Sequence, residues 1–394
     1  MDIISIMKGR ARPALLAGGV ALALAGGVIP GARLAPVADS TASTAVPEYY
    51  VALPGANNNG NVPGSVQAVV DDTFTGKQVA LLKPPAGWKF TSVSPGADDR
   101  TFVLGVEYHP EPPAVPEATA WYLVHITPGA KVHATMRKLL VPVPAESGVV
   151  AVALSPDARE LATIGNVGQP IGRTGKEKLA LRVYSVATGA VLRAWSGIFY
   201  EGFDAYTTLQ WTANGYLAFA RGWFAPAAPG DFYGVRMLQA TRPSGDLVAD
   251  SRLAWSTPVP LETPRTHKLS CAYGQEALVT ADGKTVVCSA YGVFRTPPSY
   301  GTTACPAVPA WDDGAVLEAS TATGKPVRTL YQYVTNCFTN APIILWTSAH
   351  GDVVIGEFAF GTQSTEHFGV LTENKFTPLP VPPTLETTPL SIAW

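Results

Sequence analysis

The histidines, serines and acidic residues of this chain match none of the spacings that nucleophilic catalysis or metal binding requires. A serine hydrolase needs an elbow of the G-x-S-x-G type or another nucleophile beside a histidine and an acid, and the sequence has no such elbow. No histidine pair has H-x-H or H-E-x-x-H spacing. We therefore predict no catalytic, cofactor-binding or metal-binding residue. The scattered histidines are His109, His125, His133, His267, His350 and His367.

Three pairs of adjacent aspartates could contribute to a calcium site if backbone carbonyls joined them. They are Asp71-Asp72, Asp98-Asp99 and Asp312-Asp313. None shows the alternating acidic spacing of a calcium loop, and Asp98-Asp99 falls in a repeated turn, where aspartate caps its own backbone. We interpret these pairs as structural.

Four cysteines, Cys271, Cys288, Cys305 and Cys337, lie in the last third of the chain. Their spacing does not resemble the C-x₂-C of a zinc site, and two disulfides would form in an oxidising compartment. Four cysteines allow three connectivities, which the sequence leaves open. The alternative is buried free thiols, above all for Cys288 within an apolar run.

Aromatic residues gather in or beside two long inserts rich in proline and glycine, at residues 221–234 and 291–314. Inserts on a rigid scaffold often carry recognition, although such residues can also pack an insert against the scaffold. We predict that both inserts lie on one face of the molecule, and that this face binds a partner. The partner-binding candidates are Trp223, Phe224, Phe232, Tyr233, Tyr300 and Trp311.

The N-terminus has the pattern of an export signal. Lys8, Arg10 and Arg12 precede an uncharged, mostly apolar stretch from residue 13 to 32, which is long enough to cross a bilayer. The sequence does not decide whether this segment is cleaved, so we expect either a membrane-anchored or a secreted protein. We divide the chain into a signal or anchor segment with its tether, residues 1–46, and a folded domain, residues 47–394.

The folded domain must supply the elements that position these residues, and its sequence repeats. An apolar strand, a polar turn led by Ser or Thr, and a second apolar strand recur five times, most clearly around Ser155-Pro156-Asp157. We align Ser94, Thr212, Thr280 and Thr347 with Ser155. Tight turns such as Thr188-Gly189-Ala190 and Ser244-Gly245-Asp246 lie between the copies, which gives four strands in each unit.

The two ends of the domain complete a sixth unit. The last residues, 390–394, resemble the first strand of a unit, and residues 48–53 would supply the next strand of the same unit. Such pairing hides the edges of the sheets. We therefore predict an all-β fold, a six-bladed β-propeller closed by pairing the C-terminal strand with the N-terminal strands, preceded by an N-terminal apolar helix.

The turns of the repeat resemble those of exported WD-repeat-like and TolB-like propellers. The best matches are Ser155-Pro156-Asp157-Ala158 and Ala281-Asp282-Gly283-Lys284, and the resemblance covers roughly residues 47 to 394. It implies a fold and no particular activity.

We expect a monomeric, non-catalytic propeller of the cell envelope that binds a protein, peptide or glycan. A formal net charge of −2, without a clustered basic surface, argues against nucleic acid as the partner. The alternative is an exported propeller enzyme, lactonase-like or another hydrolase, with a metal held by acidic residues in the central channel.

Overall fold

The structure is a computed structural model, and it describes most of the folded domain. The described residues are 46–54, 65–108, 118–142, 149–167, 176–200, 206–222, 234–256, 270–271, 277–291, 313–334, 343–360, 365–372, 375–380 and 391–394. The chain divides into Met1–Thr41 and Ala42–Trp394, and every described residue belongs to the second unit. The predicted export segment lies outside the described residues, and the boundary at residues 46 and 47 stays a prediction.

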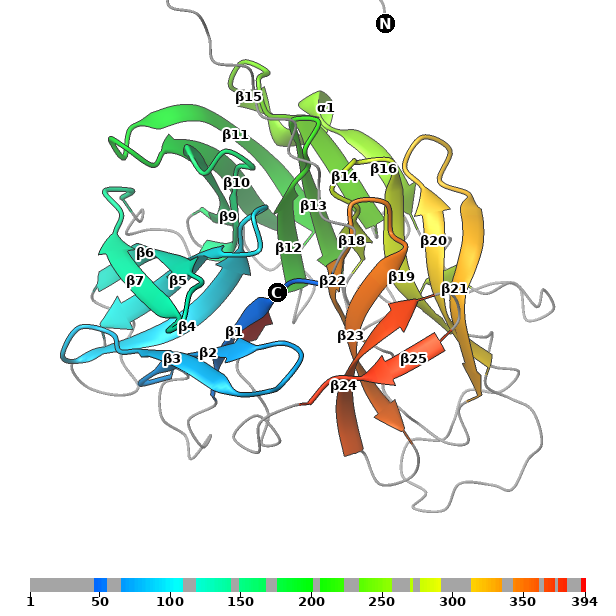
Figure 1. Cartoon of the computed structure of the whole chain (residues 1–394). Helices are drawn as coiled ribbons and strands as arrows, with labels where there is room; N and C mark the ends of the chain where they lie inside the picture. The colour runs from blue at the N-terminus through cyan, green and yellow to red at the C-terminus, as the bar shows by residue number, and fades with distance from the viewer. Residues whose placement is uncertain are drawn as a thin grey trace, which may run out of the picture. The chain divides into compact units, whose positions relative to one another are not determined.

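The described strands form six sheets, which follow one another along the chain (Figure 1). The first sheet contains β26 (Ser391–Ala393), β1 (Tyr49–Leu53), β2 (Ala68–Asp72) and β3 (Gln78–Leu82). The second contains β4 (Trp88–Pro95), β5 (Thr101–Tyr108), β6 (Ala118–Thr127) and β7 (His133–Lys138). The third contains β8 (Val149–Leu154), β9 (Glu160–Asn166), β10 (Lys176–Ser185), β11 (Val191–Tyr200) and the short β15 (Gly245–Asp246).

The remaining three sheets repeat this arrangement. The fourth contains β12 (Tyr206–Trp211), β13 (Tyr216–Gly222), β14 (Gly234–Gln239) and β16 (Arg252–Ser256). The fifth contains β17 (Ser270–Cys271), β18 (Leu278–Val279), β19 (Thr285–Tyr291), β20 (Asp313–Ser320) and β21 (Pro326–Val334). The sixth contains β22 (Ile343–Thr347), β23 (Val353–Phe360), β24 (Thr365–Thr372) and β25 (Lys375–Pro378).

Each sheet is one blade, and the first strands of successive blades touch. Strand β26 contacts β4, β4 contacts β8, β8 contacts β12, β12 contacts β18, β18 contacts β22, and β22 contacts β26. This arrangement confirms the predicted all-β, six-bladed propeller. The described residues include one short helix, α1 (Leu247–Asp250), capped by the Asp246 side chain. They hold no helix of the length and apolarity needed to span a membrane.

The core lies between neighbouring blades, because alternate residues of a strand point to opposite faces of its sheet. In β1, Tyr49, Val51 and Leu53 pack in a cluster with the second blade, whereas Tyr50 and Ala52 pack in a cluster with the sixth. Strand β26 pairs with β1 in antiparallel register, with Val51 opposite Ala393 and Leu53 opposite Ser391.

The turns between the first two strands of the blades share one conformation. A residue with a left-handed backbone occupies the same position in the turn of each of five blades, and these residues are Asp99, Ala158, Gly215, Gly283 and Gly351. The predicted alignment is wrong by two residues in the second blade, where Gly96, and not Ser94, donates its N–H across the turn to the Thr101 carbonyl. Strand β4 extends through Pro95, so Asp98 takes the place of Asp157.

The turns between the last two strands match the prediction in part. Gly76, Gly189 and Gly324 have the expected positive φ. The prediction is wrong at Ser244-Gly245-Asp246, which form no tight turn within the fourth blade. Gly245 and Asp246 instead form β15, which pairs in parallel with β11 of the third blade. The Trp195 indole N–H donates to the Pro243 carbonyl at 2.8 Å and so attaches the segment before β15 to the third blade.

Candidate functional site

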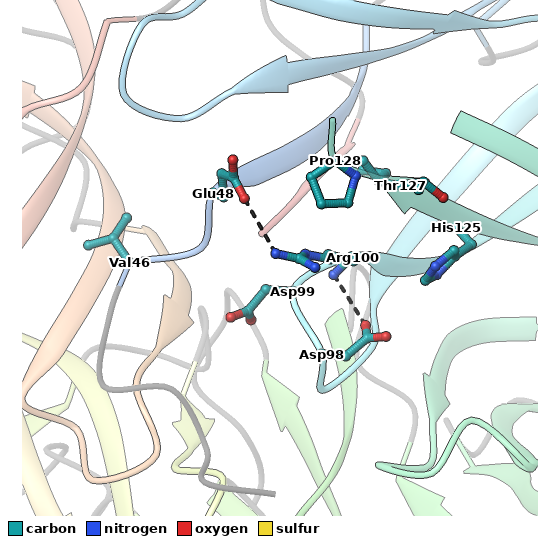
Figure 2. A pocket seen from close by; sticks show the side chains of 9 residues that line it. Val46, Glu48, Asp98, Asp99, Arg100, His125, Thr127 and Pro128 are labelled. Carbon is teal, nitrogen blue, oxygen red and sulfur yellow. Dashed lines mark hydrogen bonds and ion pairs between the residues drawn. The ribbon is translucent and has the colours of Figure 1, made fainter. Parts of the chain in front are cut away.

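A cavity of about 500 Å³ opens between the first and second blades, at the end of the sheets that carries the first turns. Its lining comes from three segments that are far apart in the sequence (Figure 2). These are the entry to β1, the β4–β5 turn and the end of β6. The lining residues are Val46, Glu48, Asp98, Asp99, Arg100, His125, Ile126, Thr127 and Pro128.

Asp98 builds the turn. Its Oδ1 accepts the backbone N–H groups of Arg100 at 3.2 Å and Thr101 at 2.7 Å, and its Oδ2 accepts the Thr101 hydroxyl at 2.7 Å. These bonds satisfy donors that a tight turn would otherwise leave unpaired. The structure therefore agrees with the capping role expected of this aspartate.

The Thr101 hydroxyl connects Asp98 to His125. A hydroxyl has one proton to donate, and Thr101 donates it to Asp98. The His125 Nδ1, 3.2 Å from the same oxygen, must therefore donate to it. We infer that Nδ1 carries a proton, which leaves Nε2 of the neutral ring as a hydrogen-bond acceptor. The side chain of His125 is exposed.

Arg100 pairs with the residue that precedes β1. Its guanidinium lies 3.6 Å from the Glu48 carboxylate, and both side chains are nearly half exposed. A pair so exposed contributes at most about 1 kcal/mol to stability. It nevertheless occupies the guanidinium, which is the cavity's cationic side chain at neutral pH.

Asp99 is the unusual residue of the cavity. It is partly buried, and no described residue forms a hydrogen bond or ion pair with its carboxylate. The pKa of Asp99 is raised to about 6, mainly by burial and also by the negative charge of Asp98, while the positive charge of Arg100 opposes the rise. A left-handed backbone costs a residue with a side chain roughly 1 kcal/mol, although less for Asp than for most. The other blades place Ala or Gly here.

The cavity is negatively charged. Three carboxylates, those of Glu48, Asp98 and Asp99, face one guanidinium, so two net negative charges remain when His125 is neutral. Figure 2 shows Asp99 beside the ion pair formed by Glu48 and Arg100. The arrangement can hold a ligand that donates hydrogen bonds and carries positive charge.

The predicted aromatic candidates lie outside the described residues: Trp223, Phe224, Phe232, Tyr233, Tyr300 and Trp311. Their inserts do connect second to third strands, β13 to β14 and β19 to β20. Whether they bind a partner stays a prediction.

The cysteines are described in part. Cys288 is 1% exposed in the core between the fourth and fifth blades. Cys305 and Cys337, and the side chain of Cys271, lie outside the description. No described cysteine is a free thiol.

From the sequence, His125 is one of six scattered histidines, and Asp99 belongs to an acidic pair interpreted as structural. No spacing motif marks either His125 or Asp99, because the cavity forms only where blades meet. In the register that the structure establishes, Asp99 occupies the turn position where other copies have Gly or Ala, a signal that the predicted alignment concealed because it placed Ala97 there. Within the described ranges, no group of three or more His, Cys, Asp or Glu side chains is arranged to hold a metal ion.

Comparison with known proteins assigns no family to this chain. No protein-family model matches the chain, and no curated protein matches its sequence. An oligogalacturonate lyase in complex with manganese is 12% identical, with a TM-score of 0.41 over 79% of this chain and 69% of that one. The periplasmic gluconolactonase of Pseudomonas aeruginosa is 13% identical, with a TM-score of 0.39 over 84% and 96%. The propeller domain of a Pyrococcus furiosus protease is 9% identical, with a TM-score of 0.41 over 84% and 79%. Similarity this low assigns no activity.

Proposed function

We propose that this chain is a non-catalytic binding propeller of the cell envelope, membrane-anchored or secreted, that acts as a monomer and takes a protein, peptide or glycan partner. The observation that carries the binding function is the charged cavity with the unpaired carboxylate of Asp99. A polar group that is partly buried without a partner is stabilised when a ligand supplies that partner. The N-terminal export pattern supports the location.

The cavity can be tested by filling it. Thr127 lines the cavity and is exposed, so Thr127→Trp should block the cavity without disturbing the core. Val66→Trp is the matched control, because Val66 is 66% exposed and does not line the cavity. Peptide and glycan arrays should bind the wild-type chain and the control but not Thr127→Trp. Equal binding by all three proteins would refute the proposal.

The insert-bearing face is a second part of this proposal. If the aromatic inserts contribute to binding, alanine replacement of Trp223, Phe232 and Trp311 weakens capture of the same array ligands. Unchanged capture removes the inserts from the proposal and leaves the cavity. Mass mapping of the oxidised protein would test the two disulfides that we propose among Cys271, Cys288, Cys305 and Cys337, which the absence of a described free thiol supports.

The alternative is an exported propeller hydrolase, lactonase-like or of another class, with a metal in the central channel. The hydrogen-bonded chain from Asp98 through Thr101 to His125 favours it, because such a chain can orient an imidazole as a general base. A stoichiometric divalent ion in the purified protein, together with lactone hydrolysis that His125→Gln abolishes, would favour the enzyme. Absence of both results would favour the binding protein.

A further inference from the structure

We infer that the cavity recognises a primary ammonium group of a peptide or protein partner, with the Asp99 carboxylate as its counter-ion. The inference rests on the proposed binding function and names the chemistry of the ligand. Asp99 is the group that carries the argument, because it is charged at neutral pH, lines the cavity and has no described partner.

The free hydrogen-bonding capacity of the described cavity consists mainly of acceptors. The Asp99 carboxylate and Nε2 of His125 both accept. Both oxygens of Glu48 are already engaged, Oε1 by the Tyr49 hydroxyl at 2.9 Å and Oε2 by Arg100. The guanidinium of Arg100, the cationic donor of the lining, is already paired with Glu48. An ammonium supplies three donors and one positive charge, which complements this set.

The turn of the second blade departs from its repeat in a way that favours this function. Ala158, Gly215, Gly283 and Gly351 fill the left-handed position of the other turns with little or no side chain. Asp99 places a carboxylate there instead, at φ 55°. Strained residues persist where the surrounding structure or a function compensates for them, and here the carboxylate has no compensating partner within the described protein.

The lining favours a peptide over a sugar. Beside the charged groups it contains Val46 and Pro128, against which the methylene stem of a lysine can pack. The described lining residues include no Trp, Tyr or Phe, the flat rings on which the apolar faces of sugars stack. An ammonium is also a better fit than calcium, which takes six to eight oxygen ligands.

Four peptide-like probes and one amino sugar, glucosamine, test the inference by calorimetry at about pH 7.5, where Asp99 is ionised. Nα-acetyl-lysinamide presents a side-chain ammonium, and alaninamide presents an N-terminal one. Diacetyl-lysinamide and N-acetyl-alaninamide are their uncharged counterparts. We expect the charged member of at least one pair to bind at least tenfold more tightly than its acetylated form, a difference of about 1.4 kcal/mol. The pair that discriminates identifies the source of the ammonium.

Three variants separate recognition from folding. Asp99→Asn should remove the discrimination. Asp99→Gly should also remove it while leaving the midpoint of thermal unfolding at or above that of the wild type, because it relieves the left-handed backbone. Ala158→Gly relieves the same conformation at φ 57° outside the cavity, so it should leave binding unchanged. Asp352→Asn, which removes an exposed carboxylate outside the lining, controls for net charge.

The outcomes distinguish this inference from the proposed function. Equal binding of charged and acetylated probes, or retained discrimination in Asp99→Asn, would overturn the ammonium site. Tighter binding of glucosamine than of either charged peptide probe would overturn the assignment of the ammonium to a peptide or protein partner. Binding of array ligands that Thr127→Trp still blocks would then leave the binding function in place. Failure of every probe at about 10 mM also overturns the inference, since such affinity is below 3 kcal/mol.

Discussion

Asp99 should make ligand binding depend on pH. Its pKa is raised to about 6, so it loses its charge as the pH falls through that value, and a neutral carboxyl no longer attracts an ammonium. Glu48, Asp98, Arg100 and His125 face the same cavity. We expect the affinity for a charged probe to fall below about pH 6, measured by calorimetry. Asp99→Asn should show a shallower dependence, and an identical dependence would contradict the assignment.

A second aspartate lies in a very different environment. Asp71 is fully buried, opposite Tyr50 in the register of β2 and β1. Neither its carboxylate oxygens nor the Tyr50 hydroxyl meets the geometry of a hydrogen bond with a described group. Burial raises the pKa of Asp71 to about 6, and the nearby Tyr50 hydroxyl opposes that rise only in part. In the folded protein Asp71 is therefore protonated up to about pH 6, well above the range of an exposed aspartate.

This raised pKa predicts that stability falls with increasing pH. Below about pH 4 Asp71 is protonated in both the folded and the unfolded chain. Between about pH 4 and 6 the unfolded chain releases the proton while the folded chain retains it, so the folded state loses stability as the pH rises. Asp71→Asn should increase the free energy of unfolding at pH 8 by about 2 kcal/mol and leave it little changed at pH 4. Urea denaturation at both pH values measures this. Asp352→Asn, at an exposed site, is the control. A variant less stable at pH 8 would contradict the prediction.

These two aspartates show what the sequence does not contain. Asp99 and Asp71 belong to acidic pairs that the sequence predicts to be structural. That prediction is correct for the other members, Asp98 and Asp72, since each caps a turn. The adjacent residues Asp99 and Asp71 differ from them because burial raises the pKa of each carboxyl. Exposure depends on the packing of blades that are not adjacent in the local sequence, which a motif of three or four residues does not record.

At the scale of elements, the first turns of neighbouring blades are joined to one another. The Asn214 side chain donates to the Asp282 carbonyl at 3.0 Å, and the Asp282 backbone N–H donates to the Ala349 carbonyl at 3.2 Å. The strand–turn–strand pattern was predictable because alternating apolar residues and glycine turns are local signals. The register of the second blade was not, because Asp98 caps the turn from a position that the Ser-Pro motif does not mark.

A charged cluster also joins the fifth and sixth blades. Glu318 on β20 is buried and pairs with Arg328 on β21, which also binds Asp352 in the first turn of the sixth blade at 2.7 Å. Arg328→Met would leave the Glu318 carboxylate buried without its cation. Because the guanidinium is 45% exposed, we expect a loss of about 2 kcal/mol in the free energy of unfolding, less than for a fully buried pair.

Double substitution tests whether the loss arises from the unpaired charge. Arg328→Met combined with Glu318→Gln should recover part of it, because a neutral amide is less costly to bury. Asp352→Asn should change stability by less than about 0.5 kcal/mol, since that pair is exposed. Urea unfolding of the wild type, Arg328→Met, Glu318→Gln and the double variant gives the coupling energy. Additive losses would show that Arg328 contributes through packing alone.

At the scale of the whole molecule, the number of blades was predictable and the cavity was not. Five turn copies and the similarity of the chain ends to strands indicate six units before any contact is known. The cavity requires residues 46–48, 98–100 and 125–128 to meet, and their meeting follows from how the first blade packs on the second. Repetition along the chain therefore predicts the scaffold, whereas the candidate site depends on departures from repetition.

The pairing of β26 with β1 gives the last prediction, which concerns how the chain ends hold the first blade together. Trp394 is 2% exposed, and its ring lies 4.9 Å from that of Tyr50 and 5.9 Å from that of Phe368 in the sixth blade. Trp394→Ala should lower the free energy of unfolding by about 3 to 4 kcal/mol, because it removes a large side chain from a packed core.

Hydrogen exchange locates the damage from Trp394→Ala. If the C-terminal strand holds the ring closed, amides of β1 such as Val51 and Leu53 should exchange faster in the variant, whereas those of β9 and β10 should exchange as in the wild type. Val327→Ala, at a side chain that is 58% exposed, should change neither stability nor exchange. Uniformly faster exchange in all blades would mean that the propeller unfolds as one unit, and unchanged exchange in β1 would refute a closing role for β26.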